Sequence, residues 1–320
     1  MPEGANEAER YRVLLNDVAD GRVVHFLGAG VNLCARPEQA GYIHGKNLPS
    51  GAELAGILAR RFGYPEPNAN DLLRVAQYVA VDRGPGPLYA ELREVFHADY
   101  PPTAVHRFIA SLPAHLRARG YADAASQVVV TTNYDDALER AFTEAQEPYD
   151  LVTYVAYGED RGRFWHTPSG EKARLVDRPN EYRGLRVKER SVIVKIHGTV
   201  SREDQERDSY VITEDDYIDY STRADVAKLL PVELVARLKN SHFLFLGYSL
   251  RDWNLRIIFH RIWGEQKLRW NSWAVQRDAS PIDRKFWATR GVEMVNQDLG
   301  ECVRLLQQAC QALPEQVRAP

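Results

Sequence analysis

Short apolar runs rich in β-branched residues alternate along the chain with longer segments in which apolar residues recur every three or four positions. The short runs predict buried strands, and the longer segments predict amphipathic helices. The predicted strands are residues 23–27, 127–131, 149–157, 192–196, 242–246, 272–276 and 292–297. The predicted helices are residues 8–19, 51–62, 71–81, 88–96, 103–112, 137–145, 223–240 and 252–263, with one more at the C-terminal end.

Strands that alternate with helices predict a parallel sheet with helices on both faces. We therefore expect an α/β fold with a Rossmann-like, doubly wound, mostly parallel sheet, formed by residues 1–320 as a single domain. Several predicted helices follow the first strand before the next strand begins, so we expect residues 47–100 to form a small helical insertion. Residues 158–190 are polar and rich in arginine, which predicts an irregular insertion.

Four of the predicted strands end in small or polar residues that could form a ligand site. These endings are Gly28-Ala29-Gly30, Thr132-Asn133-Tyr134-Asp135, His197-Gly198 and Gly247-Tyr248-Ser249. In open parallel sheets, ligands bind at the carboxyl ends of the strands. The shared position of the four motifs therefore predicts one common site.

The glycine motif after the first strand is suited to approach a phosphate group. Gly28 and Gly30 carry no Cβ, so their backbone could lie against a pyrophosphate. The usual dinucleotide fingerprint has a third glycine, and Leu33 occupies that position here. This difference argues against an ordinary dehydrogenase. The alternative interpretation is a tight turn between strand and helix that binds no ligand.

Asn133 and Asp135 lie just beyond the end of the second predicted strand. A short amide and a carboxylate at this position can hold ribose hydroxyls or a carboxamide. The alternative is that these residues cap the next helix, because Asn and Asp favour N-caps and first turns. The same alternative applies to Asp136 and to Asp252, which begins a later predicted helix.

His197 follows a buried strand and precedes a glycine. A histidine in this position can act as a general base near neutral pH. The alternative is a structural histidine, which is the more common role of a single histidine at a strand end. We interpret His25, His106 and His242 as core or packing residues.

Composition narrows the functional classes. The formal net charge of −3 gives no global basic field that would indicate nucleic acid. No apolar run reaches the roughly 18 residues that a membrane span requires. The polar, acidic start is unlike a signal peptide, and the three cysteines are unlike a disulfide framework or a paired metal motif. These features predict a cytoplasmic protein that does not bind membranes.

Taken in order, the four motifs resemble those of the sirtuin family. Sirtuins have a Gly-Ala-Gly opening, a Thr-x-Asn-x-Asp motif, a His-Gly motif and a late strand that ends in Gly-x-Ser. The corresponding segments here begin at Gly28, Thr131, His197 and Gly247, within a resemblance that spans residues 20–300. Four longer segments are similar to a bacterial branch of sirtuin-like proteins used in antiphage defence: VVTTNYDDALERAF, VIVKIHGTV, YVITEDDY and FLFLGYSLRDWNLR.

The resemblance implies NAD bound across the strand ends, with the glycine turn on the phosphates. It implies that Asn133 and His197 are the essential catalytic pair, and we expect Asp135 to contact the carboxamide or to help to orient Asn133. Asn32 stands where the family has a serine. The NAD-binding residues expected from the resemblance are Gly28, Ala29, Gly30, Asn32, Thr132, Gly247, Ser249 and Asp252.

One departure from the family favours hydrolysis of NAD over deacylation. Protein-deacylating sirtuins hold zinc with four cysteines in two pairs, whereas Cys34, Cys302 and Cys310 are unpaired in sequence. We therefore expect a sirtuin-like fold without the zinc module, and no metal. The replacement of the family's serine by Asn32 also favours hydrolysis over deacylation. The expected activity is cleavage of the nicotinamide–ribose bond of NAD, the substrate, to nicotinamide and ADP-ribose.

Uncontrolled loss of NAD would kill the host cell, so we expect an inactive state that a trigger releases. The resemblance suggests an abortive-infection effector of antiphage defence. Control is expected from self-association as a homo-oligomer or from a separately encoded activator. By family analogy, that activator could be an ATPase or an Argonaute-like protein.

Three other functions remain open. The first is an NAD-dependent protein deacylase, and the second is a non-catalytic sensor that binds NAD or ADP-ribose. The third is a nucleic-acid-binding module, because residues 251–290 are locally basic with interleaved tryptophans. We favour another explanation of that pattern, in which the basic residues form the solvated face of a helix and the tryptophans belong to the core beneath it.

Overall fold

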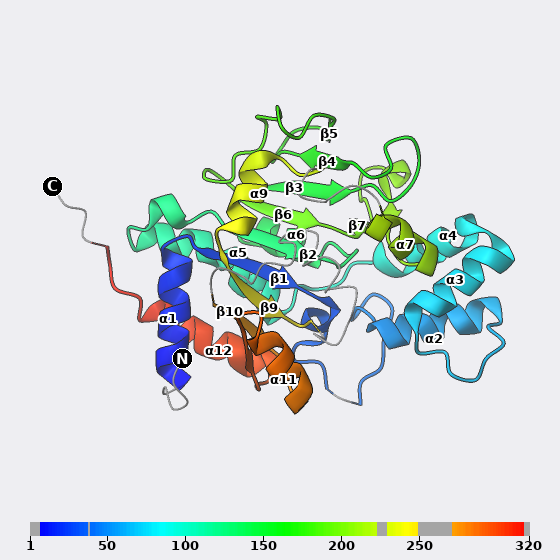
Figure 1. Ribbon diagram of the computed structural model, residues 1–320, viewed down its shortest axis with the longest axis horizontal. Helices are drawn as coiled ribbons and strands as arrows, with labels where there is room; N and C mark the ends of the chain where they lie inside the picture. Colours follow the sequence, from blue (N-terminus) through cyan, green and yellow to red (C-terminus); the bar gives the residue numbers. More distant parts are fainter. Residues whose placement is uncertain (1–6, 38, 223–228, 249–270, 317–320) are drawn as a thin grey trace.

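The computed structural model describes residues 7–37, 39–222, 229–248 and 271–316 (Figure 1). Within this part of the chain, the main sheet has the strand order β11-β10-β9-β1-β2-β6-β3-β4-β5. All strands from β11 to β3 run parallel, and β4 and β5 continue the sheet in antiparallel fashion. The strands are β1 (Val23–Leu27), β2 (Val128–Thr131), β3 (Tyr149–Tyr154), β4 (Phe164–Thr167), β5 (Arg174–Val176), β6 (Ser191–Lys195), β9 (His242–Leu246), β10 (Ser272–Val275) and β11 (Val292–Val295). The predicted Rossmann-like, doubly wound and mostly parallel sheet is confirmed.

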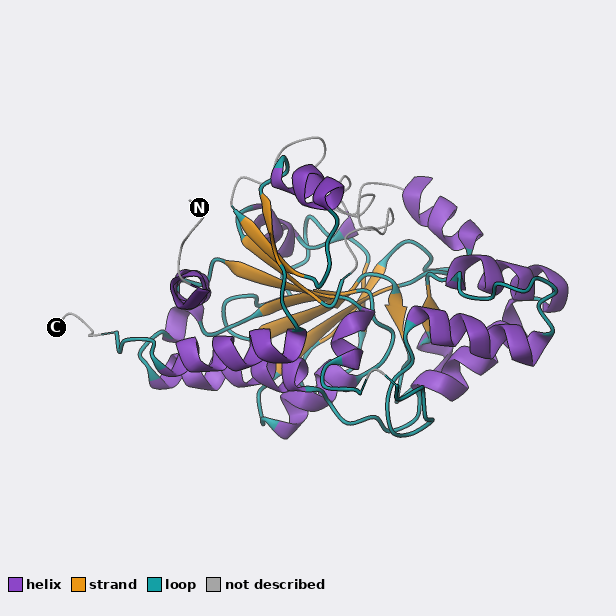
Figure 2. Cartoon of the chain, turned by 90° about the horizontal axis from the view of Figure 1, so that it is seen from below, coloured by secondary structure: helices purple, strands orange, loops and turns teal. Residues whose placement is uncertain are grey.

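Helices cover both faces of the sheet (Figure 2). One face packs on α1 (Glu7–Ala19), α5 (Ala104–Ala118), α6 (Ala137–Glu144) and α12 (Leu299–Gln311). The other face packs on α7 (Glu214–Thr222), α9 (Val232–Lys239) and α11 (Pro281–Ala288). Side chains alternate between the two faces along a strand. In β1, Val23 and Leu27 therefore join the first core, whereas Val24 and Phe26 join the second.

Three further helices form a helical module with a core of its own. They are α2 (Gly51–Phe62), α3 (Leu72–Arg83) and α4 (Pro85–Phe96), and they pack around Leu58, Val79 and Leu92. The module lies beyond the carboxyl ends of the parallel strands (Figure 1). It therefore stands over the edge of the sheet at which the four motifs were expected to meet.

Residues 158–190 are more regular than expected, because β4 and β5 lie within them. The sequence pattern was misleading because burial in β4 does not follow hydrophobicity. His166 is fully buried, while Trp165 is only partly buried. His166 is accommodated in the interior because its Nδ1 lies 2.5 Å from the Tyr182 hydroxyl and its Nε2 lies 3.2 Å from Asp150 Oδ2.

The predicted helix at 252–263 lies outside the described residues, as does most of the basic stretch at 251–290. Two tryptophans of that stretch, Trp273 and Trp287, are buried, in agreement with a core role. Among the described residues, no helix is both long enough and apolar enough to cross a bilayer.

Candidate functional site

A cavity of about 730 Å³ lies where the four strand-end motifs meet, and we refer to it as the strand-end cavity. Its wall also includes residues of α2 and α3 from the helical module. The sequence-predicted residues in this wall are Gly28, Ala29, Gly30, Asn32, Thr132, Asn133, Asp135, His197 and Gly247. Two other predicted residues, Ser249 and Asp252, lie outside the described residues. The cavity has the size usual for a small-molecule site.

Strand register explains why motifs so far apart in sequence meet. Leu27 of β1 pairs with Thr131 of β2 on one side and with Leu246 of β9 on the other. Thr131 in turn pairs with Lys195 of β6. The loops after these four strands therefore leave the sheet at the same level.

The glycines of the first and last motifs allow two loops to touch. The amide of Gly28 donates to Leu246 O at 3.0 Å, and the amide of Gly30 donates to Gly247 O at 2.8 Å. A Cβ on Gly30 would lie 2.6 Å from Gly247 O. Close packing between the loops therefore accounts for these glycines by itself, and a role on phosphates remains a prediction.

Gly247→Ala should destabilise the protein by at least about 1–3 kcal/mol, because Gly247 adopts a φ of +65° that side chains rarely tolerate. A Cβ there would also lie 2.2 Å from Val31 N. Urea denaturation measures the effect. Gly86→Ala is the control, because a Cβ on Gly86 in α4 would meet no atom within 4 Å. Equal free energies of unfolding for the two variants would contradict this explanation.

Asn133 and Asp135 are both held in place by the polypeptide. The amide of Asn133 donates to Thr131 Oγ1 at 3.1 Å, and its side-chain Nδ2 lies 3.4 Å from Gly28 O. Asp135 Oδ2 accepts a 2.9 Å hydrogen bond from Asn32 Nδ2, and its Oδ1 accepts one from the amide of Ala137. Asp135 therefore binds the first amide of α6 with one oxygen and holds Asn32 with the other. Asn32 Oδ1 is buried and has no hydrogen-bond partner among the described residues.

His197 lies in the cavity wall and is only 2% exposed. Burial lowers the pKa of His197 to about 3, so its imidazole is neutral at physiological pH. The Tyr217 hydroxyl lies 3.2 Å from Nδ1. Within the described part of the chain, Nε2 has no partner. A neutral histidine with one uncommitted ring nitrogen is able to accept a proton from a bound ligand.

The free energy of unfolding should fall by at least about 2 kcal/mol between pH 7.5 and pH 5, in the absence of ligand. Burial lowers the pKa of His25 and of His106 to about 4, and that of His197 to about 3. Unfolded histidines have a pKa of about 6.5, so below that pH the unfolded chain binds protons that the folded chain excludes. Urea denaturation across this range checks the prediction, and an unchanged free energy would contradict it.

Lys195, the last residue of β6, is fully buried. Its ammonium donates to Glu139 Oε1 at 2.8 Å, to Tyr134 O at 3.3 Å and to Asp135 O. All three of its hydrogens are thereby used. Burial raises the pKa of Glu139, and the charge of Lys195 opposes that shift. The ion pair therefore attaches the turn that contains Asn133 and Asp135 to β6, the strand that ends near His197.

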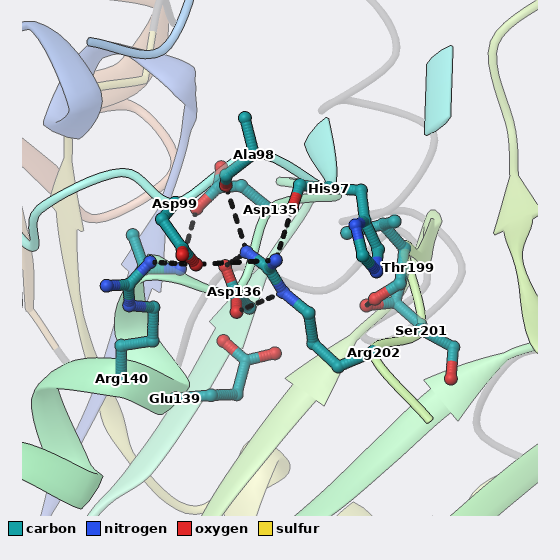
Figure 3. A network of polar contacts seen from close by, with 12 residues as sticks. His97, Ala98, Asp99, Asp135, Asp136, Glu139, Arg140, Thr199, Ser201 and Arg202 are labelled. Carbon is teal, nitrogen blue, oxygen red and sulfur yellow. Dashed lines mark hydrogen bonds and ion pairs between the residues drawn. The ribbon is translucent and has the colours of Figure 1, made fainter. Parts of the chain in front are cut away.

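Arg202 joins the helical module to the same turn (Figure 3). Its guanidinium donates to both carboxylate oxygens of Asp136, at 2.7 and 2.9 Å. It also donates to the carbonyls of His97 and Ala98, which follow α4. A planar guanidinium matches a carboxylate in this two-point manner. Arg202 therefore links three segments: its own loop, the turn before α6 and the residues that follow α4.

Sequence reasoning missed Lys195, Arg202 and Tyr217. Lys195 had a usable signal, because a lysine inside the apolar strand that precedes His197 must be paired when it is buried. Arg202 and Tyr217 had none, since their partners depend on the tertiary fold. The loops after β10 and β11 also line the cavity with polar residues that sequence reasoning did not select, namely Gln276, Arg277, Gln297 and Asp298.

The cavity offers an amide, a carboxylate and a neutral imidazole on a partly apolar wall. Such a set can bind a hydroxyl-rich ligand and accept a proton from it. No group of three or more His, Cys, Asp or Glu side chains in the described part of the chain could hold a metal ion.

Two solved structures resemble this chain at low sequence identity. One is a structure titled "Structural Basis for the Mechanism and Regulation of Sir2 Enzymes", with a TM-score of 0.42, 14% identity, and coverage of 96% of this chain and 98% of the other. The other is a mutant Sir2 homologue in complex with ADP ribose, with a TM-score of 0.40, 15% identity, and coverage of 98% and 100%.

Curated relatives are similar in sequence. The NAD(+) hydrolase ThsA of Bacillus cereus (strain MSX-D12) is 26% identical over 249 residues, which cover 77% of this chain and 41% of the relative. ThsA of Acinetobacter baumannii (strain 532279) is 26% identical over 251 residues, or 78% and 41% of the two chains. The chain thus spans about two fifths of the length of these relatives. The SIR2-like domain family matches residues 127–295, more than half of the chain. The protein belongs to the SIR2-like family.

Proposed function

We propose that this protein hydrolyses NAD at the nicotinamide–ribose bond. The observation that carries the proposal is the presence of Asn133 and His197 in the wall of one cavity at the carboxyl ends of the strands. The names of the two curated relatives, both NAD(+) hydrolases, support it. The family membership supports a common ancestry with NAD-dependent enzymes.

The reaction consumes one NAD and one water and gives nicotinamide, ADP-ribose and a proton. Nicotinamide leaves as a neutral molecule, so no strong general acid is required. Positive charge develops on the ribose, and the protein must hold the sugar and admit water. Asn133 holds the ribose or positions the water, and His197 accepts a proton from a ribose hydroxyl or from the water. Asp135 contributes by holding Asn32 at the cavity wall.

We assign the glycine turn to the phosphate side of the ligand. In this arrangement Gly28, Ala29 and Gly30 lie beside the pyrophosphate, with Thr132 and Gly247 in the neighbouring wall. Ser249 and Asp252 remain proposed NAD-binding residues outside the described part of the chain.

In the cell, the protein acts as an abortive-infection effector of antiphage defence that is inactive until triggered. Control comes from self-association or from a separately encoded activator, in the cytoplasm. A protein that is monomeric and fully active in isolation would contradict this regulation.

Incubation of the purified protein with NAD, with and without an acetylated peptide, tests the proposed reaction against its alternatives. The hydrolase gives nicotinamide and ADP-ribose in equal amounts without the peptide. Peptide-dependent release of nicotinamide would instead indicate a deacylase. Binding of NAD without any turnover, over a range of protein concentrations and with candidate activators present, would indicate a sensor.

A further inference from the structure

The residues around His197 pair through their backbone with the segment 209–217. The strand β7 (Gly198–Thr199) directly follows His197 and pairs with β8 (Ser209–Tyr210). The amide of Val211 donates to His197 O at 2.9 Å. Gly198 has a φ of +91°, and a Cβ there would lie 2.1 Å from Ser209 O. The glycine of the His-Gly motif therefore permits this contact between the two strands.

Helix α7 begins within this segment, and its first residue is fixed by a hydrogen-bonded pair. Thr213 Oγ1 accepts from the amide of Asp216, and Asp216 Oδ2 accepts from the amide of Thr213, both at 3.0 Å. This reciprocal pair is a capping box, which sets where α7 begins. Tyr217 comes directly after it, as the last residue of the segment YVITEDDY. The motif thus determines the position of the Tyr217 side chain.

Contacts from outside hold α7 in place. Gln77 of α3 donates to Asp215 Oδ2 at 2.8 Å and accepts from the amide of Asp215 at 3.0 Å. Arg161 pairs with Asp219 at 2.5 Å. The helix is thus fixed both to the helical module and to the loop that precedes β4, so Tyr217 has a defined position relative to His197.

Tyr217 meets His197 with its ring edge and with its hydroxyl. The two rings are nearly perpendicular, at 88°, with centroids 5.2 Å apart, and the hydroxyl lies 3.2 Å from Nδ1. Tyr220, one turn later on the same helix, contacts the same imidazole with its ring at a centroid distance of 5.7 Å. The Tyr217 hydroxyl is therefore placed to act on one specific ring nitrogen.

We infer that Tyr217 is a positioning residue that fixes the tautomer of His197, with Nδ1–H donating to the Tyr217 oxygen and Nε2 left as the acceptor. In a neutral imidazole only one nitrogen carries hydrogen, and the hydrogen bond of one nitrogen determines the state of the other. The opposite tautomer would place an N–H at Nε2, which is buried and has no partner among the described residues. The inference rests on the proposed function for the use of Nε2 as a base, although the tautomer itself belongs to the resting protein.

Nitrogen-15 NMR of the histidine rings reads the tautomer without substrate. The His197 signals are identified among the nine histidines by their loss in His197→Gln. We expect the Nδ1–H form in the wild-type protein and its loss, in favour of the Nε2–H form or a mixture, in Tyr217→Phe. Tyr220→Phe is the matched control and should leave the tautomer unchanged. Unchanged signals from the other histidines show that each variant is folded.

The kinetic consequence is a fall in kcat of roughly 10–100-fold in Tyr217→Phe, as for the hydrogen-bond partners that orient histidines at metal sites, with KM for NAD within about twofold. Tyr220→Phe should remain close to the wild-type protein. An Nε2–H form in the wild-type protein, or an unchanged tautomer in Tyr217→Phe, would overturn the inference. The expected tautomer shift without any cleavage of NAD, at every protein concentration and with every candidate activator tested, would support the role of Tyr217 and refute the proposed function, so the two failures are distinguishable.

Discussion

His197→Ala should abolish nearly all release of nicotinamide from NAD while the protein stays folded. A general base contributes about 10²–10⁴-fold to the rate, and a neutral imidazole is the proton acceptor that the cavity wall offers in this account. Chromatographic measurement of nicotinamide gives the rate. Thermal unfolding followed by circular dichroism shows whether the fold persists.

The control for His197→Ala is His25→Ala, which removes another buried histidine from the interior. His25 lies in β1, where its Nε2 is 3.0 Å from Gln127 Oε1, and it does not line the cavity. Both variants should lose some stability, but only His197→Ala should lose activity. Full turnover by folded His197→Ala protein would refute the assignment of His197 as the base.

Lys195→Met should lower the free energy of unfolding by about 3–5 kcal/mol, the cost of leaving one member of a buried ion pair without its partner. Glu139 would remain buried with its pKa raised further, because the Lys195 charge that now opposes the shift would be gone. The carbonyls of Tyr134 and Asp135 would also lose a donor. Urea denaturation measures this effect.

Two further variants define the cause of that loss. Lys195→Met combined with Glu139→Leu should recover part of the stability, because an apolar pair can replace a buried ion pair. Lys172→Met, at an exposed lysine, should change the free energy by no more than about 0.5 kcal/mol. If Lys195→Met were no more destabilising than Lys172→Met, the pair would not hold the turn in the way described.

The strands and the strand-end motifs could be predicted from sequence because the parallel sheet is buried on both faces. Its strands are therefore continuous apolar runs, and each run ends where the polar motif begins. Helix α2 was predicted with its observed bounds, since Ser50 and Glu53 form a capping box and Gly63 ends the helix in a left-handed conformation. The meeting of the motifs in one cavity followed from the topology rule for parallel sheets.

The remaining features depend on contacts that no local pattern encodes. The pairing of Arg202 with Asp136 joins residues 66 positions apart. The role of Tyr217 arises only when β7 and β8 bring the segment 209–217 against His197. Gly28 and Gly30 were predicted as site residues because their backbone could approach a phosphate. The contacts that the structure shows for them are instead with the loop after β9, and packing of the two loops also requires glycine there.

The central claim is that the strand-end cavity cleaves NAD with Asn133 and His197. The most direct test is to incubate NAD with wild-type and with Asn133→Ala protein and to analyse the products. The incubations cover a range of protein concentrations and include candidate activators. We predict nicotinamide and ADP-ribose in equal amounts from the wild-type protein and neither product from folded Asn133→Ala protein. Intact NAD under every condition with the wild-type protein, or equal product formation by the two proteins, would contradict the account.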